Sequence, residues 1–597
     1  MNVNIEEIQE YLEEFSLTAE DEVLKKMKEL CFVYHCSAED IVDQWIAFCS
    51  SKKKNCQSPT LPMLDQMEKE DMMKTKSSKQ RKSTGSVSTP VYNSSTIDLI
   101  CNNQLETPDR NSKINSQPMD QSPVFSPKSM TPTCFTPSRK YASRNNTGDA
   151  ICSFGEIQNV EWKHSDEFSC SVTAYNEKSV LRESYPFMCE KLRDRASILN
   201  DMIQEASNDF VKEHNVEDWG HIHLPSVETV PVIGRICSDG SGRLNPASLL
   251  LEGSQEISSG QTIPLDVSGL ESFSFFPGQI IAGTGINNSG KKLIMKSLYE
   301  YTFPESQPKA PDLANCFDSL GVVIATGPFA TSDTLSYEPL WDLMKYVKTY
   351  MPHVVILTYD SINIKYRFSF QILHFFSFSQ IGPFVDLKNN LIENGDLNET
   401  YNDIFQRLVL EILKHIEHLS TKVILVPSVR DAHHDFIYPT PPYSVDHATK
   451  RLYLASDPCV LNIEGVIFAI TSTDILLHLG KEEISYPQQP DRLGRLCKHI
   501  LTQKNFYPLY PPNEEINVDF LHYEHYAGLP VMPHVLVVPS DFRCFIKNIN
   551  GCCCINPERL VKHSTGGTFV RLKVNQMDTN KYEGSIIDNI QAQILKI

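Results

Sequence analysis

The sequence predicts a multidomain chain with an α-helical N-terminal bundle, a disordered linker, a small β-barrel and an α/β sandwich. Three observations predict it. Apolar residues recur at helical spacing near the N-terminus, Ser, Thr and Pro then replace them over residues 51–150, and β-branched runs alternate with helical segments after residue 320. The length of 597 residues allows three or four domains at roughly 100–200 residues each.

Composition limits the classes of protein to which the chain can belong. Hydrophobic residues make up 41% and charged residues 22%, which excludes a wholly disordered, collagen-like or disulfide mini-scaffold chain. The net charge of -19 argues against a protein that coats nucleic acid with its whole surface, because phosphate binding needs clustered Lys and Arg. A local basic groove remains open.

The cysteines and the N-terminus indicate an intracellular protein. Seventeen cysteines are scattered apart from the run 552–554, and no Cys-x-x-Cys pair occurs. We therefore expect reduced thiols and neither a zinc ribbon nor a redox motif. The acidic start lacks the basic stretch and apolar core of a signal peptide.

Residues 1–50 are predicted to form a small helical docking domain. Apolar side chains recur there at steps of three and four, including Ile5, Ile8, Leu12 and Phe15. This spacing is typical of an amphipathic helix. A bundle of this size buries little core, so docking of partners is a better expectation than chemistry.

Residues 51–150 are expected to be disordered, because their polar composition cannot offset the entropy lost on ordering. Six Ser/Thr-Pro sites are candidates for regulated phosphorylation: Thr89, Thr107, Ser122, Ser126, Thr131 and Thr136. Phosphates there would add negative charge to a basic segment. A basic cluster is a candidate nuclear-import signal: Lys74, Lys76, Lys79, Arg81 and Lys82. Simple solvation by charge is the equally open alternative.

Residues 151–214 are predicted as a helical lead-in to the folded core, with a helix over 178–214. Its expected apolar stripe contains Leu192, Ile198, Leu199, Ile203 and Phe210. Residues 215–305 then show short strands separated by Gly-rich turns, at 229–236, 248–252, 262–267, 279–282 and 293–298. Five closely spaced strands suggest a small barrel, of which the OB-fold is the commonest five-stranded form.

Residues 306–597 are predicted to form an α/β sandwich. Continuous β-branched runs, typical of strands buried on both faces, occur at 321–325, 354–357, 423–426, 466–470 and 535–538. Helical segments lie between several of them, at 337–350, 399–418 and 491–503. The loops that follow the strands are where an active site would lie.

Two motifs resemble binding sites but fail on inspection. Residues 285–291 (GINNSGK) nearly match a phosphate-binding loop, but Lys292 replaces the Ser or Thr that holds magnesium. The residues after it alternate like a strand, so we expect a β-hairpin turn. The pair His221 and His223 has no carboxylate or cysteine nearby, and we interpret it as two surface histidines.

A third candidate has the spacing of a metallophosphoesterase. Asp431 and His433 follow the strand 423–426 with Asp-x-His spacing, and Asp386 is a further carboxylate after the second strand. Two metal ions need several such loops. The other loops instead carry proline, at 327–329 (GPF), 382–384 (GPF) and 538–540 (VPS). We therefore expect vestigial metal positions, no catalytic, metal-binding or cofactor-binding residue, and no cofactor.

Taken together, these features resemble the accessory B-subunits of eukaryotic replicative DNA polymerases. The matching motifs lie at 276–279 (FPGQ), 327–333 (GPFATSD), 426–434 (VPSVRDAHH), 471–474 (TSTD), 507–512 (YPLYPP) and 566–569 (GGTF). Their order best matches the B-subunits of polymerase alpha. In that family the second folded domain is a calcineurin-like phosphoesterase that has lost its metals.

The resemblance implies a non-catalytic, nuclear subunit of the polymerase alpha–primase complex. It implies that the barrel and sandwich hold the zinc-containing C-terminal domain of the catalytic subunit. Primase would then be reached through the complex, other replication factors through the N-terminal head, and DNA only indirectly. The resemblance further implies a role in primer synthesis at initiation and on the lagging strand, a phosphorylated linker and no contact with membranes.

One segment departs from the family pattern. Residues 358–380 separate the strand 354–357 from its Gly-Pro-Phe loop and carry an aromatic run. If this insertion were buried at a junction between a core strand and its loop, it would disrupt the packing of the core. If it were exposed, it would form an aromatic surface patch. We interpret the insertion as a splice variant or an incorrect gene model, and the alternative is a lineage-specific loop that binds a partner. Two rival functions stay open: an active metallophosphoesterase, and a single-stranded-DNA-binding module that uses the barrel.

Overall fold

The computed structural model describes most residues of 138–304, 319–358 and 400–597, and near the N-terminus mainly one helix. The chain divides into two units, Met1–Val124 and Phe125–Ile597. The insertion at 359–380, all six Ser/Thr-Pro sites and the five basic import candidates lie outside the described residues. So do Asp386 and His433.

In the first unit, helix α2 (Asp21–Tyr34) has the amphipathic pattern expected for this region. One face of it is buried: Val23, Leu24, Met27, Leu30 and Cys31. Ile41 and Trp45 are also fully buried. A helix with an apolar stripe at this spacing fits the predicted docking domain, whose full extent over 1–50 stays a prediction.

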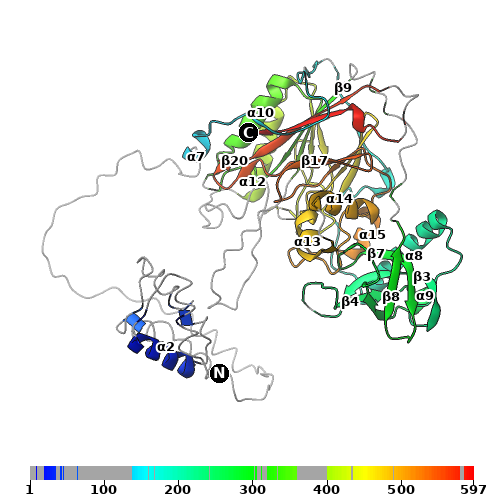
Figure 1. Cartoon of the computed structure of the whole chain (residues 1–597). Helices are drawn as coiled ribbons and strands as arrows, with labels where there is room; N and C mark the ends of the chain where they lie inside the picture. The colour runs from blue at the N-terminus through cyan, green and yellow to red at the C-terminus, as the bar shows by residue number, and fades with distance from the viewer. Residues whose placement is uncertain are drawn as a thin grey trace, which may run out of the picture. The chain divides into compact units, whose positions relative to one another are not determined.

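The second unit is built on two β-sheets (Figure 1). Seven described strands form the first, in the order β1 (Ala150–Phe154), β22 (Ile590–Lys596), β21 (Thr568–Asn575), β9 (Ser319–Thr326), β10 (Val354–Thr358), β11 (Lys422–Leu425) and β12 (Leu452–Leu454). Strands β9 to β12 are parallel, and the others are antiparallel.

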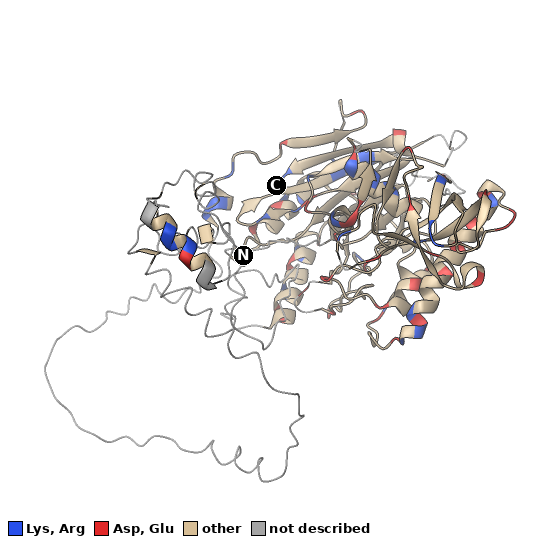
Figure 2. Cartoon of the chain, turned by 60° about the horizontal axis from the view of Figure 1, so that its bottom comes forward, with Lys and Arg blue, Asp and Glu red and all other residues tan. Residues whose placement is uncertain are grey.

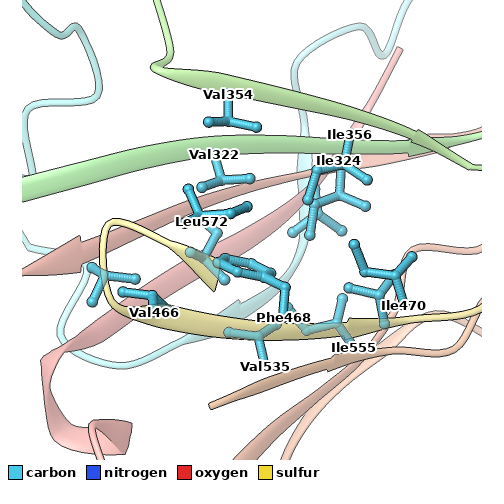
Figure 3. Packing of buried hydrophobic residues seen from close by; sticks show 14 of the residues in the cluster. Val322, Ile324, Val354, Ile356, Val466, Phe468, Ile470, Val535, Ile555 and Leu572 are labelled. Carbon is cyan, nitrogen blue, oxygen red and sulfur yellow. The ribbon is translucent and has the colours of Figure 1, made fainter. Parts of the chain in front are cut away.

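Six described strands form the second sheet, in the order β17 (Phe545–Ile549), β18 (Cys552–Asn556), β16 (Val535–Val537), β14 (Val466–Ile470), β13 (Cys459–Ile463) and β2 (Val172–Ala174). The inner faces of the two sheets share one core, where Phe468 packs among aliphatic side chains of both (Figure 3). The continuous β-branched runs arise because each strand is buried on both faces.

Helices cover the outer face of each sheet. Helices α10 (Glu338–Tyr350) and α12 (Tyr401–His415) pack on the first sheet. Helices α13 (Ile475–Glu482), α14 (Arg492–Thr502) and α15 (Phe520–Tyr526) pack on the second. The described residues therefore form the predicted α/β sandwich.

The barrel closes from five strands: β3 (Ser226–Ser238), β4 (Leu249–Glu252), β5 (Thr262–Asp266), β7 (Ile280–Asn287) and β8 (Leu293–Leu298). All five lie where the sequence predicts them, although β7 continues to residue 287, beyond the predicted end at 282. Helix α8 (Leu192–His214) packs across β3 and β7 through Ile203 and Phe210. The short helix α9 (Gln255–Ser258) lies between β4 and β5.

The prediction of a helical lead-in over 151–214 is wrong for its first part. Strand β1 pairs with β22 and strand β2 with β13, so this segment adds an edge strand to each sheet. The short 3-10 turn η5 (Glu177–Ser179) follows β2, and the described residues 180–191 after it are not helical. The free edges of the two sheets offer unpaired backbone groups, and these outweigh local helix propensity.

Two further expectations are wrong, one about a side chain of α8 and one about the end of the linker. Leu192 begins α8 but is 84% exposed, so it does not belong to the buried stripe. The predicted disordered linker extends to residue 150, yet the described residues from 138 onward include helix α7 (Arg139–Ala142) and the start of strand β1. Tyr141 is buried there and donates to Asp342 Oδ2 at 3.0 Å. This contact with the sandwich orders the end of the linker.

Candidate functional site

The candidate site is the edge where the parallel strands β9, β10 and β11 end. At the ends of β9 and β10, the hydroxyls of Thr326 and Thr358 lie 3.0 Å apart and are buried. The backbone N–H of Gly327 donates to the carbonyl of Thr358 at 2.9 Å. The described ends of these two strands thus meet through hydroxyls and a backbone hydrogen bond.

Asp431 follows β11 and is the one predicted vestigial metal position that lies within the described residues. It is 5% exposed, and its Oδ2 accepts a hydrogen bond from the hydroxyl of Tyr443 at 2.7 Å. This carboxylate therefore holds the loop after β11 to Tyr443. Asp386 and His433 lie outside the described residues, so their role as vestigial metal positions stays a prediction.

A second carboxylate at the strand ends, Asp457, is one that the sequence reasoning misses. It is fully buried between β12 and β13. Its oxygens accept hydrogen bonds from the Thr471 and Thr473 hydroxyls at 2.8 and 3.0 Å. The N–H and hydroxyl of Ser472 donate to it at 2.7 Å each. Burial raises the pKa of Asp457, and these hydrogen bonds oppose that shift. The three consecutive hydroxyl side chains at 471–473 are the sequence signal that could have pointed to a buried carboxylate acceptor.

Asp474 and Asp541 have structural partners of the same kind. Asp474 caps helix α13 by accepting from the N–H of Leu477 at 2.9 Å, and it also accepts from the N–H of Asp541 at 2.9 Å. Asp541 in turn accepts from Arg559 at 2.8 and 2.6 Å. The side chain of Arg559 is 2% exposed. Each of these carboxylates thus links two segments of the sandwich.

Within the described ranges, no cluster of three or more His, Cys, Asp and Glu side chains is arranged to hold a metal ion. Among the helices that the structure describes, none is long and apolar enough to cross a membrane.

The sequence motif at 285–291 is a hairpin turn, as predicted. Strands β7 and β8 pair antiparallel on either side of it. Gly290 has φ +74, a conformation that favours glycine. Lys292 pairs with Asp266 at 2.8 Å. The imidazole of His223 lies 2.9 Å from the carbonyl oxygen of Gly290, so this partly buried ring fastens the turn.

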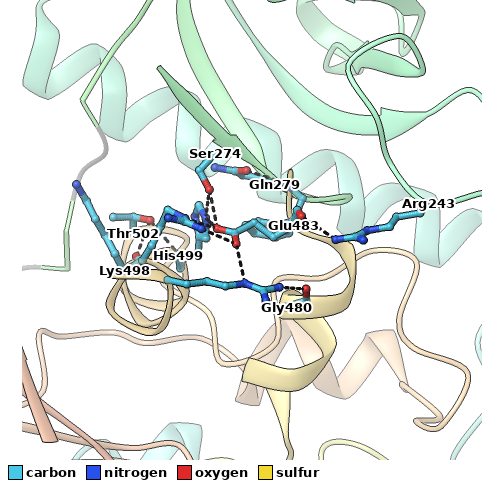
Figure 4. A network of polar contacts seen from close by, with 11 residues as sticks. Arg243, Ser274, Gln279, Gly480, Glu483, Lys498, His499 and Thr502 are labelled. Atoms are coloured by element: carbon cyan, nitrogen blue, oxygen red, sulfur yellow. Dashed lines mark hydrogen bonds and ion pairs between the residues drawn. The ribbon is translucent and has the colours of Figure 1, made fainter. Parts of the chain in front are cut away.

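The barrel and the sandwich meet in a second polar site (Figure 4). Strand β6 (Phe273–Phe275) of the barrel region pairs with β15 (Ile484–Tyr486) of the sandwich region. Beside this ladder, Glu483 accepts from Arg495 Nε at 2.6 Å and from the Ser274 hydroxyl at 2.7 Å. His499 Nε2 lies 3.3 Å from the same carboxylate.

The charges in this junction are set by burial and by hydrogen bonds. Burial acts to raise the pKa of Glu483, but hydrogen bonds from His499, Arg495 and Ser274 outweigh it and lower that pKa to about 2. Burial lowers the pKa of His499, and its hydrogen bond to Glu483 opposes that shift. The junction therefore holds an ionised Glu483 facing a guanidinium.

Three family models match separate parts of the chain. The N-terminal family of the DNA polymerase alpha B-subunit matches residues 6–74. The OB domain of the same B-subunit matches 196–301, and the family of DNA polymerase alpha/epsilon B-subunits matches 380–547. An OB-fold barrel followed by a phosphoesterase-like domain defines the class of polymerase B-subunits.

Curated relatives extend the similarity to the whole chain. The DNA polymerase alpha B-subunit of Rattus norvegicus is 35% identical over 634 residues, and the match covers 100% of both chains. The DNA polymerase alpha B-subunit of Drosophila melanogaster is 28% identical, and the match covers 99% of this chain and 100% of that protein. That of Saccharomyces cerevisiae is 25% identical over 66% of this chain and 60% of its own. The chain belongs to the family of DNA polymerase alpha B-subunits, as its motifs indicate.

Proposed function

We propose that this chain is the non-catalytic accessory subunit of the DNA polymerase alpha–primase complex and acts in the nucleus. The full-length similarity to relatives named as polymerase alpha B-subunits carries the proposal. The strand-end geometry supports its non-catalytic part, because Asp431, Asp457 and Asp474 each accept hydrogen bonds from protein donors. Asp457 supports it most strongly, because it is fully buried and its two oxygens already accept four hydrogen bonds.

The proposed partner is the zinc-containing C-terminal domain of the catalytic subunit, held by the barrel and the sandwich. Their polar junction around Glu483 supports this, since it fixes the two domains into one surface. Primase would join through the complex, and the N-terminal head would dock other replication factors. We propose roles at initiation and on the lagging strand, with regulation through the Ser/Thr-Pro linker.

Co-expression with the C-terminal domain of the catalytic subunit tests the partnership. The two chains are expected to elute together on gel filtration as one stoichiometric species. Separate elution of two folded chains, each with a cooperative thermal transition, would contradict the proposal.

A hydrolysis assay tests the non-catalytic part independently. Purified chain supplied with Mn²⁺ and a phosphodiester is expected to show no turnover above that of Asp431→Asn, which keeps the size of the side chain. Turnover that Asp431→Asn abolishes would instead favour an active metallophosphoesterase. Tyr443→Phe, which removes the hydroxyl donor to Asp431, is the matched control for a loss of fold at this loop.

A further inference from the structure

A groove of about 920 Å³ lies between the barrel and the sandwich, next to the junction in Figure 4. The barrel contributes the loop between β3 and β4, and the sandwich contributes β15 and the start of α14. The groove is therefore made jointly by two regions that are far apart in the sequence.

The groove carries an excess of positive charge. Its two carboxylates are paired, Asp266 with Lys292 at 2.8 Å and Glu483 with Arg495 at 2.6 Å. Two further arginines, Arg243 and Arg492, also line it. The chain as a whole has a net charge of -19, and Figure 2 shows both signs interspersed along its ribbon. A basic groove stands out against that background.

Among the described residues, Arg243 hydrogen-bonds only to a backbone carbonyl, and Arg492 shares the single charge of Glu483 with Arg495. Arg243 is exposed and donates to the backbone carbonyl of Glu483 at 3.4 Å. Arg492 is 47% exposed at its side chain and donates to the carbonyl of Gly480, and its Nε lies 3.6 Å from the Glu483 carboxylate, which Arg495 already binds. Guanidinium groups held in this way can bind phosphate through two parallel hydrogen bonds.

An aromatic side chain lies in the same groove. Tyr486 is 61% exposed, and its ring stacks on Phe273 with centroids 6.1 Å apart. Phe273 stacks in turn on the buried Phe275 at 5.2 Å. These two rings fix the orientation of the exposed one, so Tyr486 presents a preorganised face. Such a face binds a nucleic-acid base of any sequence.

We propose that this groove binds single-stranded nucleic acid, with a base stacked on Tyr486 and neighbouring phosphates bound by Arg243 and Arg492. Its place in the fold supports this, because the loop between the first two strands is one that OB-folds use for oligonucleotides. An acidic polypeptide would satisfy the arginines but leave the tyrosine face unused. The inference goes beyond the accessory role, which needs no contact with DNA.

Fluorescence anisotropy of labelled oligothymidine with the full-length chain tests the proposal. Tyr486→Ala is expected to weaken binding about 5- to 160-fold, and Tyr486→Phe to retain it, because one stacked base is lost only in the first variant. The double variant R243Q/R492Q is expected to flatten the salt dependence by about 1.4 in the log–log slope, as for two phosphates on a single strand. Oligouridine in parallel distinguishes DNA from RNA as the source.

Arg182→Gln is the matched charge control, because this exposed arginine pairs with Glu177 and does not line the groove. The inference is wrong if Tyr486→Ala binds as tightly as the unchanged chain, or if no saturable binding occurs at low salt. Competition by polyglutamate that Tyr486→Ala leaves unaffected would favour an acidic peptide instead. Every variant is also tested for co-elution with the C-terminal domain of the catalytic subunit. A variant that co-elutes but does not bind nucleic acid keeps the proposed function, so the two proposals can fail separately.

Discussion

Asp457 accepts two hydrogen bonds from Ser472, one from the backbone N–H and one from the hydroxyl, both at 2.7 Å. Asp457 lies in the chain between β12 of the first sheet and β13 of the second, and Ser472 follows β14 of the second. This contact therefore fastens the first sheet to the second. The buried Asp457 carboxylate thus acts as a structural link between the two sheets.

Asp457→Ala is expected to lower the free energy of unfolding by about 3 kcal/mol, because it leaves several buried donors without their acceptor. Asp457→Asn keeps the shape of the side chain and one carbonyl oxygen, so its free energy of unfolding should fall by less than that of Asp457→Ala. Urea unfolding followed by tryptophan fluorescence measures both. Equal midpoints for the Ala variant and the unchanged chain would show that the contact contributes nothing.

Glu483 gives a pH dependence with a defined sign. Its pKa is lowered from 4.5 to about 2, so folding stabilises the ionised form. That contribution, about 3 kcal/mol, is present above pH 4.5 and is lost as the pH falls toward 2. Chemical unfolding of the unchanged chain and Glu483→Gln at several pH values should therefore give stabilities that converge below pH 4.5. Curves that stay parallel over this range would contradict the assignment.

Gly278 is expected to tolerate no side chain. It has φ +93, and a Cβ there would lie 2.4 Å from the backbone nitrogen of Tyr510, across the junction of barrel and sandwich. Gly260 provides a matched control, since it has φ +65 but open space around its Cβ. Gly260→Ala should cost only the backbone strain of about 1 to 2 kcal/mol.

Gly278→Ala should cost more than that and should loosen the barrel from the sandwich. Limited proteolysis detects this as faster cleavage between the two domains than in Gly260→Ala. Identical cleavage rates and stabilities for the two variants would mean that close packing at Tyr510 is unimportant.

Truncation tests the edge strand that only the structure reveals. A chain that starts at residue 125 keeps β1 on β22, whereas one that starts at residue 156 exposes the whole β22 edge. We expect the first to remain monomeric and the second to aggregate, because an unpaired apolar edge pairs with other chains. Light scattering at matched concentrations measures the difference. Two monomeric products would show that β1 is dispensable.

The sequence is most informative where a local pattern has a single structural solution. The five barrel strands and the β-branched runs of the sandwich are predictable because burial on one or both faces constrains residue type directly. The hairpin turn at 285–291 is predictable because Lys292 and an alternating run exclude a phosphate loop. The family follows from the order of several modest motifs.

Other features cannot be derived from local pattern. Residues 150–154 and 172–174 carry no distinctive strand signal, and only the free sheet edges make them strands. The exposure of Leu192 depends on where α8 begins. Asp457 escapes sequence reasoning because its donors lie fourteen to sixteen residues later in the chain.

The sequence by itself determined the family, the order of the domains and the absence of the usual metal-binding motifs, because these depend on residue types and their spacing. Only the tertiary structure decided how the carboxylates at the strand ends are used and that Arg243 and Tyr486 share a groove. Hydrogen-bond partners and shared grooves depend on which distant segments meet. That is fixed by the packing of whole sheets and helices, and no local pattern of residues encodes it.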